Sequence, residues 1–190
     1  ALGKRFAENR GQLSRLGPST MSALSRLDED PLSTASTGTT NGGAMRAPPV
    51  GLSSRTLSEC VEQTVESTLI THGSDAAISA ACAVSCAVWK AVESEDMNDV
   101  INAALIGARK GAGYGAPTEI PAVDETIELA LSLTLDEAVG RIGNGMEAVE
   151  TVPLAFKCFH DLKETEDAVT TAVNLGGDTD TMGSITGALS

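Results

Sequence analysis

The segment Ala76–Trp89 leaves little choice of fold, because its side chains are almost all small and apolar. Only Ser79 and Ser85 interrupt it. A helix made of these residues has almost no polar face to turn toward water, so other helices must pack around it. It is also too short to cross a bilayer. We therefore expect a central buried helix, with Ser74 as its N-cap.

The composition favours an all-α fold around this helix. Aromatic residues make up 3% of the 190 residues and there are 19 glycines, so the core must be built from small side chains that let backbones come close. Alanine-rich stretches favour helices, whereas strands favour the β-branched and aromatic residues that are scarce here. The length suits one domain. We predict one all-α domain over residues 1–190, made of many antiparallel or orthogonal helices.

Apolar periodicity and capping residues place the other helices. Thr134 and Glu137 have the spacing of a capping box, and Ser19 or Thr20 can cap the second helix. Glycine, proline and hydroxyl residues are dense over 31–53, which predicts a loop without a lasting regular element. The predicted helices cover two segments of 1–30 broken at Gly17 and Pro18, then 54–73, 98–110, 122–133, 134–140, 146–162 with a kink or restart at Pro153, 165–174, and 181 onward.

Charge and cysteine content bear on partners and location. Acidic residues outnumber basic residues 26 to 13, which gives a net charge of -13. Such a field repels phosphate backbones and anionic membranes, so we expect neither nucleic-acid binding by bulk charge nor membrane association. Three of the four cysteines lie in apolar helical segments, as reduced core cysteines usually do, so we predict a cytoplasmic protein. The cysteines are Cys60, Cys82, Cys86 and Cys158.

The sharpest chemical signal is the segment NLGGDTDT, residues 174–181. It places Asp178, Asp180 and Thr181 on a turn that enters a helix. Carboxylate and hydroxyl oxygens suit Mg²⁺, Mn²⁺ or Ca²⁺. The alternative is that either aspartate only caps the helix and complements its dipole. Three ligands do not complete a site of six or more oxygens, so other ligands must come from elsewhere.

A second signal is GTTNGGAMR, residues 38–46. Asn41 offers an amide, and the two glycines after it expose backbone N–H groups that could cradle an anionic ligand. The alternative is a tight turn with Asn41 in the left-handed conformation. His72 follows one predicted helix and precedes the cap of the next, where it could contact a ligand or the preceding carbonyls.

Four segments together resemble the ADP-ribosylglycohydrolase family: GGDTDTMGSITGAL, NGGAMRAPPVGL, THGSDAA and GNGMEAVETVPLAF. They occur in the family's order and span roughly residues 36–190. The resemblance implies an all-α orthogonal multi-helix bundle with a dinuclear Mg²⁺ or Mn²⁺ site in a cleft. It implies that Asp178, Asp180 and Thr181 are metal ligands and that the two aspartates are the catalytic residues. Residues along the ADP-ribose site would be Gly38, Thr39, Asn41, His72, Gly145 and Met146, the last two near the sugar.

The implied activity is metal-dependent hydrolysis of the glycosidic bond that links ADP-ribose to a protein side chain or a small molecule. Family members carry a GDxxG segment and a Thr-Asp-Asp cluster, which supply further ligands and a catalytic glutamate. This chain has neither before its first motif, so we expect it to be the C-terminal portion of a longer ADP-ribosylglycohydrolase domain. Two other hypotheses stay open: a non-catalytic ADP-ribose-binding or structural relative of the kind found among lens crystallins, and a Ca²⁺-stabilised helical module.

Overall fold

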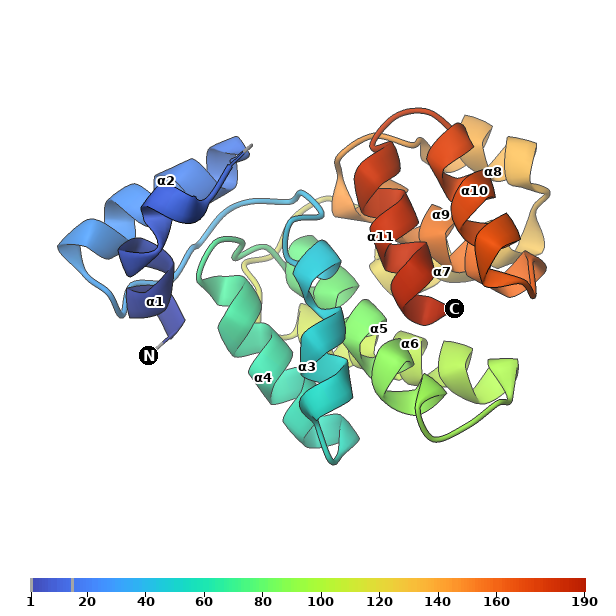
Figure 1. Cartoon of the computed structure of the whole chain (residues 1–190), viewed down its shortest axis with the longest axis horizontal. Coiled ribbons are helices and arrows are strands. Elements are labelled where there is room, and N and C mark those ends of the chain that lie inside the picture. The colour runs from blue at the N-terminus through green and yellow to red at the C-terminus, as the bar shows by residue number, and fades with distance from the viewer. Residues whose placement is uncertain (1, 15) are drawn as a thin grey trace.

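The computed structural model describes residues 2–14 and 16–190. Its described part consists of α-helices and two short 3₁₀ turns, joined by loops, with only two isolated β-bridges and no sheet (Figure 1). The prediction of an all-α fold is confirmed. The helices are α1 (Leu2–Glu8), α2 (Pro18–Glu29), α3 (Pro48–Ser53), α4 (Leu57–Leu69), α5 (Asp75–Ala91), α6 (Met97–Ala112), α7 (Val123–Ser132), α8 (Leu135–Ile142), α9 (Ala148–Asp161), α10 (Thr165–Asn174) and α11 (Thr179–Leu189), and the 3₁₀ turns are η1 (Arg10–Gln12) and η2 (Ala44–Arg46).

Helix α5 is the predicted central helix. The Ser74 hydroxyl accepts a hydrogen bond from the Ala77 N–H at 3.1 Å and so caps it, and its residues are buried from Ala76 to Val88. Helices α3, α4, α6, α9 and α11 all contact α5. Small residues set this close packing: a Cβ on Gly107 of α6 would lie 2.6 Å from a carbonyl oxygen of α5. The apolar run therefore forms the core, as its composition predicts.

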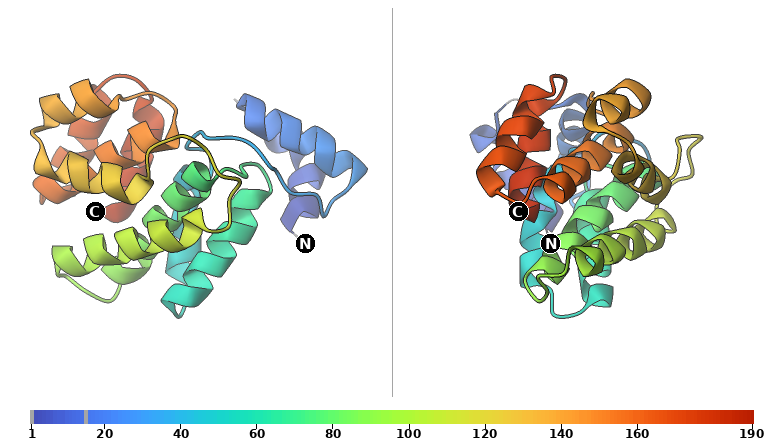
Figure 2. Two further views of the ribbon diagram at one scale, coloured as in Figure 1. Left: turned by 180° about the vertical axis from the view of Figure 1, so that it is seen from behind. Right: turned by 90° about the vertical axis from the view of Figure 1, so that its right-hand side faces the viewer.

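The C-terminal helices form a second layer on α5 and carry one wall of the site. Helix α9 lies at its centre and contacts α7, α8, α10 and α11 (Figure 2). Val152 and Phe156 of α9 are fully buried in the main hydrophobic cluster, and Leu154 belongs to a second cluster with Met182 of α11. The packing of α9 on α11 fixes the loop that precedes α11.

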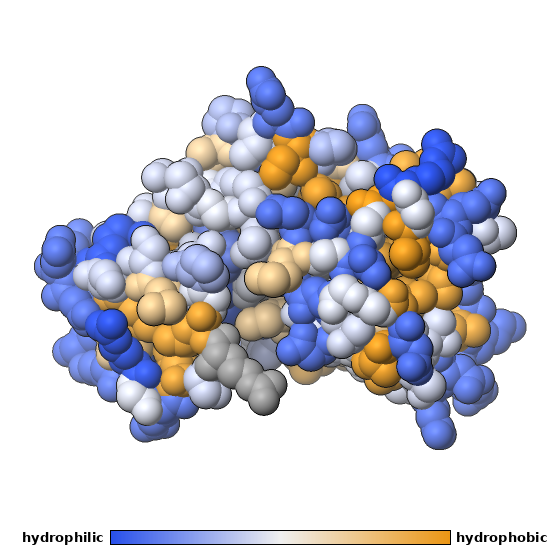
Figure 3. All heavy atoms as spheres, turned by 90° about the horizontal axis from the view of Figure 1, so that it is seen from above, coloured by the Kyte–Doolittle hydropathy of each residue, from blue (hydrophilic) through white to orange (hydrophobic). Residues whose placement is uncertain are grey.

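The N-terminal helices α1 and α2 stand beside the main body and pack on each other (Figures 1 and 2). Contacts that join them to it include a hydrogen bond from the Arg26 guanidinium to the Ile70 carbonyl at 2.7 Å, and the Arg46 guanidinium lies 5.7 Å from the centre of the Phe6 ring. The face in Figure 3 is mainly hydrophilic, with separate hydrophobic patches. Residues of α2 and of loops in the main body line a common cavity.

Several local expectations are wrong. Helix α3 lies within the segment predicted to be a loop, because prolines at its first positions suit a helix start. Gly17, without a side-chain cap, is the N-cap of α2, since Pro18 takes the first helical position ahead of Ser19 and Thr20. Helix α9 continues through Pro153, so the restart is wrong and the kink stays a prediction. Helix α8 ends at Ile142, two residues later than predicted, and has the expected capping box of Thr134 and Glu137.

The four cysteines are free and buried, as expected for core residues. Within residues 2–14 and 16–190, none of the helices has the length and apolar character needed to span a bilayer.

Candidate functional site

Three loops meet where the sequence motifs come together. The segment before η2 pairs with the segment before α9: the Asn41 N–H donates to the Met146 carbonyl at 3.0 Å, and the Ala148 N–H donates to the Thr39 carbonyl at 3.0 Å. The loop before α11 joins them, since the Asp178 N–H donates to the Asn144 carbonyl at 2.9 Å. Motifs far apart in the sequence therefore form one continuous surface.

Glycines make this junction possible. Gly176 and Gly177 have φ values of +77° and +71°, a region that side chains other than glycine rarely adopt. A Cβ on Gly177 would lie 1.8 Å from the Asn144 carbonyl oxygen, a distance that no side chain can occupy. The two glycines before Asp178 are thus required by backbone geometry, and they set where α11 begins.

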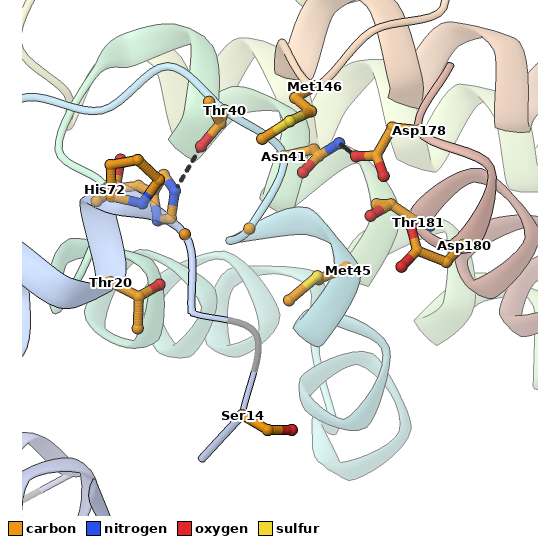
Figure 4. Close-up of a pocket in the computed structure, with 14 residues that line it drawn as sticks. Ser14, Thr20, Thr40, Asn41, Met45, His72, Met146, Asp178, Asp180 and Thr181 are labelled. Atoms are coloured by element: carbon orange, nitrogen blue, oxygen red, sulfur yellow. Dashed lines mark hydrogen bonds between the residues drawn. The ribbon is translucent and has the colours of Figure 1, made fainter. Parts of the chain in front are cut away.

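Asp178, Asp180 and Thr181 line one cavity (Figure 4). Asp178 takes the N-cap position of α11, but its side chain makes no capping hydrogen bond, so the capping alternative does not describe it. Asp180 accepts from the Thr181 N–H at 2.9 Å. Burial raises the pKa of the Asp178 carboxyl and contact with Asp180 raises it further, whereas hydrogen bonds from Asn41 and Thr181 oppose that rise. Two carboxylates and a hydroxyl are therefore gathered at one point.

Asn41 holds Asp178 in place. Its amide nitrogen donates to the Thr151 hydroxyl oxygen at 2.7 Å and to an Asp178 carboxylate oxygen at 2.5 Å. The Thr151 hydroxyl donates its own hydrogen to the Gly145 carbonyl oxygen, 2.7 Å away. Both partners of the amide nitrogen are therefore acceptors, and this fixes the orientation of the amide. Asn41 is 5% exposed, and its immediate role is to orient a carboxylate.

His72 is 2% exposed and lies between two threonine hydroxyls. Its Nε2 is 2.9 Å from Thr40 Oγ1, and its Nδ1 is 2.8 Å from Thr71 Oγ1. Burial, together with the charge of Arg46, lowers the pKa of His72 to about 4, so the ring is neutral at pH 7. The two ring nitrogens of His72 contact hydroxyls, whereas its backbone N–H donates to the preceding Thr68 carbonyl at 2.8 Å.

The cavity that these residues line has a volume of about 330 Å³ and lies between α2 and the three loops. Figure 4 shows Thr40, Asn41, Met146 and Asp178 on one side and Thr20 on another. Its lining residues are Ser14, Gly17, Pro18, Ser19, Thr20, Thr40, Asn41, Gly42, Met45, His72, Met146, Asp178, Asp180 and Thr181.

Three predicted residues lie outside this lining. Gly38, with φ +100°, packs behind His72, and Gly145 contributes the carbonyl that accepts from Thr151. Thr39 lines a second cavity of about 580 Å³ on the other side of the paired segments. Thr40 lines the first cavity together with Asn41, although sequence reasoning passed over it.

Sequence reasoning also missed the wall formed by α2 and Met45. Ser19 and Thr20 are in the first turn of α2, where backbone N–H groups have no partner within the helix. The position of Thr40 between Thr39 and Asn41, two residues that the family resemblance names, could have identified it. Only the folding of α2 against the loops could have identified the other residues, because no motif links α2 to them.

The donor set fits a hard divalent cation, since it consists of carboxylate and hydroxyl oxygens and the carboxylates repel each other. These three side chains would supply only part of the coordination sphere of such a cation. In the portion of the chain that the structure describes, no group of three His, Cys, Asp or Glu side chains is arranged to hold a metal ion. Further ligands would have to be water, substrate or another polypeptide segment.

Comparison with known proteins gives the family of this chain. The chain is 34% identical over 83 residues to the ADP-ribosylhydrolase ARH3 of Homo sapiens, covering 38% of this chain and 23% of that protein. It is 36% identical over 69 residues to ARH3 of Bos taurus, covering 30% and 19%, and 36% identical over 55 residues to an uncharacterized protein of Archaeoglobus fulgidus, covering 29% and 18%. The matches thus span less than a quarter of these relatives.

A solved structure described as an ADP-ribosylglycohydrolase-related protein complex has the same fold, with a TM-score of 0.76 and 23% identity, over 98% of this chain and 60% of that one. The family model described as ADP-ribosylglycohydrolase matches residues 1–190. The chain therefore belongs to the ADP-ribosylglycohydrolase family.

Proposed function

We propose that this protein hydrolyses the glycosidic bond between ADP-ribose and an acceptor, either a protein side chain or a small molecule. Family membership supports this proposal. The observation that carries it is the meeting of Asp178, Asp180 and Thr181 in one cavity with the loop that contains Thr40 and Asn41. The same cavity therefore contains oxygen atoms that can bind cations and polar groups that can bind a nucleotide-like ligand.

The proposed cofactor is a pair of Mg²⁺ or Mn²⁺ ions, held on this side by Asp178, Asp180 and Thr181. When bound there, the ions would supply Lewis acidity toward the ribose and the attacking water. Asn41 engages one carboxylate oxygen of Asp178 and thereby turns the other oxygen in a fixed direction. Such orientation by a neighbouring hydrogen bond commonly decides how well a ligand binds metal.

The same carboxylates suit the reaction. Hydrolysis places water on the anomeric carbon, breaks the bond to the acceptor, and leaves the electron pair and a proton with the acceptor. The transition state resembles an oxocarbenium ion. Asp178 and Asp180 would stabilise its positive charge, provided that they stay ionised.

Binding of a diphosphate by a chain with net charge -13 needs local donors. The cavity offers them in the first turn of α2, at Ser19 and Thr20, where free N–H groups favour anions. It also offers the backbone at Gly42. These donors support an anionic ligand in spite of the global charge.

A non-catalytic ADP-ribose-binding relative is the second candidate. It is favoured by the small donor set: two carboxylates and one hydroxyl supply fewer than the six oxygens that these cations usually take. On this alternative the cavity retains the ligand without cleaving it.

Release of ADP-ribose from an ADP-ribosylated peptide, measured with Mg²⁺ or Mn²⁺, separates the candidates when combined with calorimetric binding of free ADP-ribose. Hydrolysis predicts release by the unmodified protein and its loss in Asp178→Asn and Asp180→Asn, with unchanged helix content by circular dichroism. Asp167→Asn, at an exposed position in the first turn of α10, is the matched control and should keep full activity. Binding without release supports the second candidate, and the absence of both contradicts the proposal.

A further inference from the structure

The hydrogen-bond partners of His72 determine which ring nitrogen carries the proton. The chain of contacts begins at Arg46, whose guanidinium donates to the Thr71 hydroxyl oxygen at 2.5 Å. A guanidinium has no acceptor, so the direction of this hydrogen bond is certain. The Thr71 hydroxyl lies 2.8 Å from His72 Nδ1 and is itself 2% exposed.

The Thr71 oxygen accepts from Arg46, so the Thr71 hydroxyl hydrogen must be donated to a different partner. Among the hydrogen bonds of the described residues, its remaining partner is His72 Nδ1. If Nδ1 carried a proton instead, the buried Thr71 hydroxyl would lose its acceptor, which is costly. The charge of Arg46 on the same side also disfavours a proton on that nitrogen. Nδ1 is thus the acceptor of the pair.

A neutral imidazole carries one proton, and the pKa of about 4 keeps His72 neutral at pH 7. With Nδ1 as acceptor, the proton is on Nε2 and is donated to Thr40 Oγ1, 2.9 Å away. Thr40 then accepts with its oxygen, and its hydroxyl hydrogen remains for another partner. The side chain lines the cavity (Figure 4), so a ligand there is the available acceptor.

We propose that His72 is a positioning residue with its proton on Nε2, and that it thereby frees the Thr40 hydroxyl to donate to an anionic phosphoryl oxygen of the ligand. This inference rests on the proposed function in taking ADP-ribose as that ligand. It changes the expected role of His72: the residue acts on the ligand through Thr40. The other tautomer would make Thr40 the donor to His72 and leave the cavity without this hydrogen.

Nuclear magnetic resonance tests the tautomer without any ligand. The chain has two histidines, His72 and His160, and His160→Gln leaves the His72 ring signals alone in the spectrum. Long-range ¹H–¹⁵N spectra at pH 7 should show a protonated Nε2 and an unprotonated Nδ1 for His72. A proton on Nδ1, or on both nitrogens, overturns the inference. Thr71→Val should produce a mixture of tautomers, and an unchanged spectrum in that variant contradicts the proposed chain of hydrogen bonds.

Calorimetry with ADP-ribose in the presence of Mg²⁺ tests the ligand contact. Thr40→Val removes the hydroxyl at nearly constant shape and should weaken binding roughly ten- to a hundredfold, the range for a hydrogen bond to a charged group. Thr40→Ser should restore the affinity, and Thr170→Val, which alters an exposed threonine of α10 outside the cavity lining, should leave it unchanged. Melting temperatures show whether each variant is folded.

Equal affinities of Thr40→Val and the unmodified protein overturn the role of Thr40 while leaving the proposed function intact. Failure of the unmodified protein to bind ADP-ribose contradicts the proposed function and the ligand assigned to Thr40, whereas the His72 tautomer is still decided by the spectra. The two failures are therefore distinguishable.

Discussion

Replacing Gly177 by alanine should damage the junction of the site loops far more than the same change at Gly176. The two glycines are adjacent and have similar left-handed backbones, with φ +71° and +77°. A Cβ on Gly176 would lie an ordinary 3.5 Å from the side-chain amide nitrogen of Asn144, whereas a Cβ on Gly177 would lie 1.8 Å from the Asn144 carbonyl oxygen. The pair therefore separates backbone strain from loop contact.

The magnitudes follow from these distances. Left-handed strain costs each variant about 1 kcal/mol. In Gly177→Ala the Asn144 carbonyl must also move, and it is the acceptor of the Asp178 N–H at 2.9 Å. Loss of that hydrogen bond adds about 1 kcal/mol, and displacement of packed backbone adds a further ~1 kcal/mol or more. We expect about 1 kcal/mol for Gly176→Ala and about 3 kcal/mol for Gly177→Ala.

Urea unfolding followed by circular dichroism measures both values. A difference of about 2 kcal/mol corresponds to roughly 4–8 °C in melting temperature for a domain of this size. Mn²⁺ titration should show weaker binding for Gly177→Ala, because Asp178 moves with the loop. Equal losses of stability in the two variants would refute the claim that the Asn144 carbonyl and the Gly177 backbone are locked together.

Three further predictions follow from the packing and the charges. The pKa of His72 is about 4 in the folded protein and 6.5 ordinarily, so the unfolded chain binds the proton first as the pH falls. The free energy of unfolding should therefore fall by about 3 kcal/mol between pH 6.5 and pH 4. Urea unfolding of His72→Gln should lack this part of the pH dependence. Gly107→Ala should destabilise by about 1–3 kcal/mol because its Cβ meets α5, whereas Gly140→Ala, an exposed helical position with open space around it, should stabilise by about 0.5–1 kcal/mol; thermal melting checks both signs. Asn41→Ala should weaken Mn²⁺ binding roughly 10–100-fold while Asn174→Ala, at an exposed position, leaves it unchanged in calorimetry.

Much of the fold was predictable because helix α5 is apolar on nearly every face. A helix of that kind requires surrounding helices, and caps such as Ser74 and Thr134 mark where elements begin. The differences at α3 and α9 concern proline. Its effect depends on whether it takes a first-turn position, as in α3, or lies inside a helix that continues past it, as Pro153 does, and sequence spacing alone does not distinguish these cases.

The candidate site was predictable to the extent that its chemistry is concentrated in short motifs. Asp178, Asp180 and Thr181 occur together in the sequence and are brought together in the cavity. Thr40 was missed because its importance comes from His72, a residue 32 positions away. The role of Asn41 likewise depends on Thr151 and Asp178, which only the fold brings within hydrogen-bond distance. Cytoplasmic location and the status of the chain as a C-terminal portion stay predictions.

Crystals of the protein grown with MnCl₂ and ADP-ribose test the metal site most directly, through anomalous scattering collected at the manganese edge. We predict an anomalous peak about 2 Å from the carboxylate oxygens of Asp178 and Asp180 and the hydroxyl of Thr181, with ADP-ribose beside it and a phosphoryl oxygen next to Thr40. A well-ordered structure with manganese bound only elsewhere, or with ADP-ribose density outside this cavity, would contradict the account.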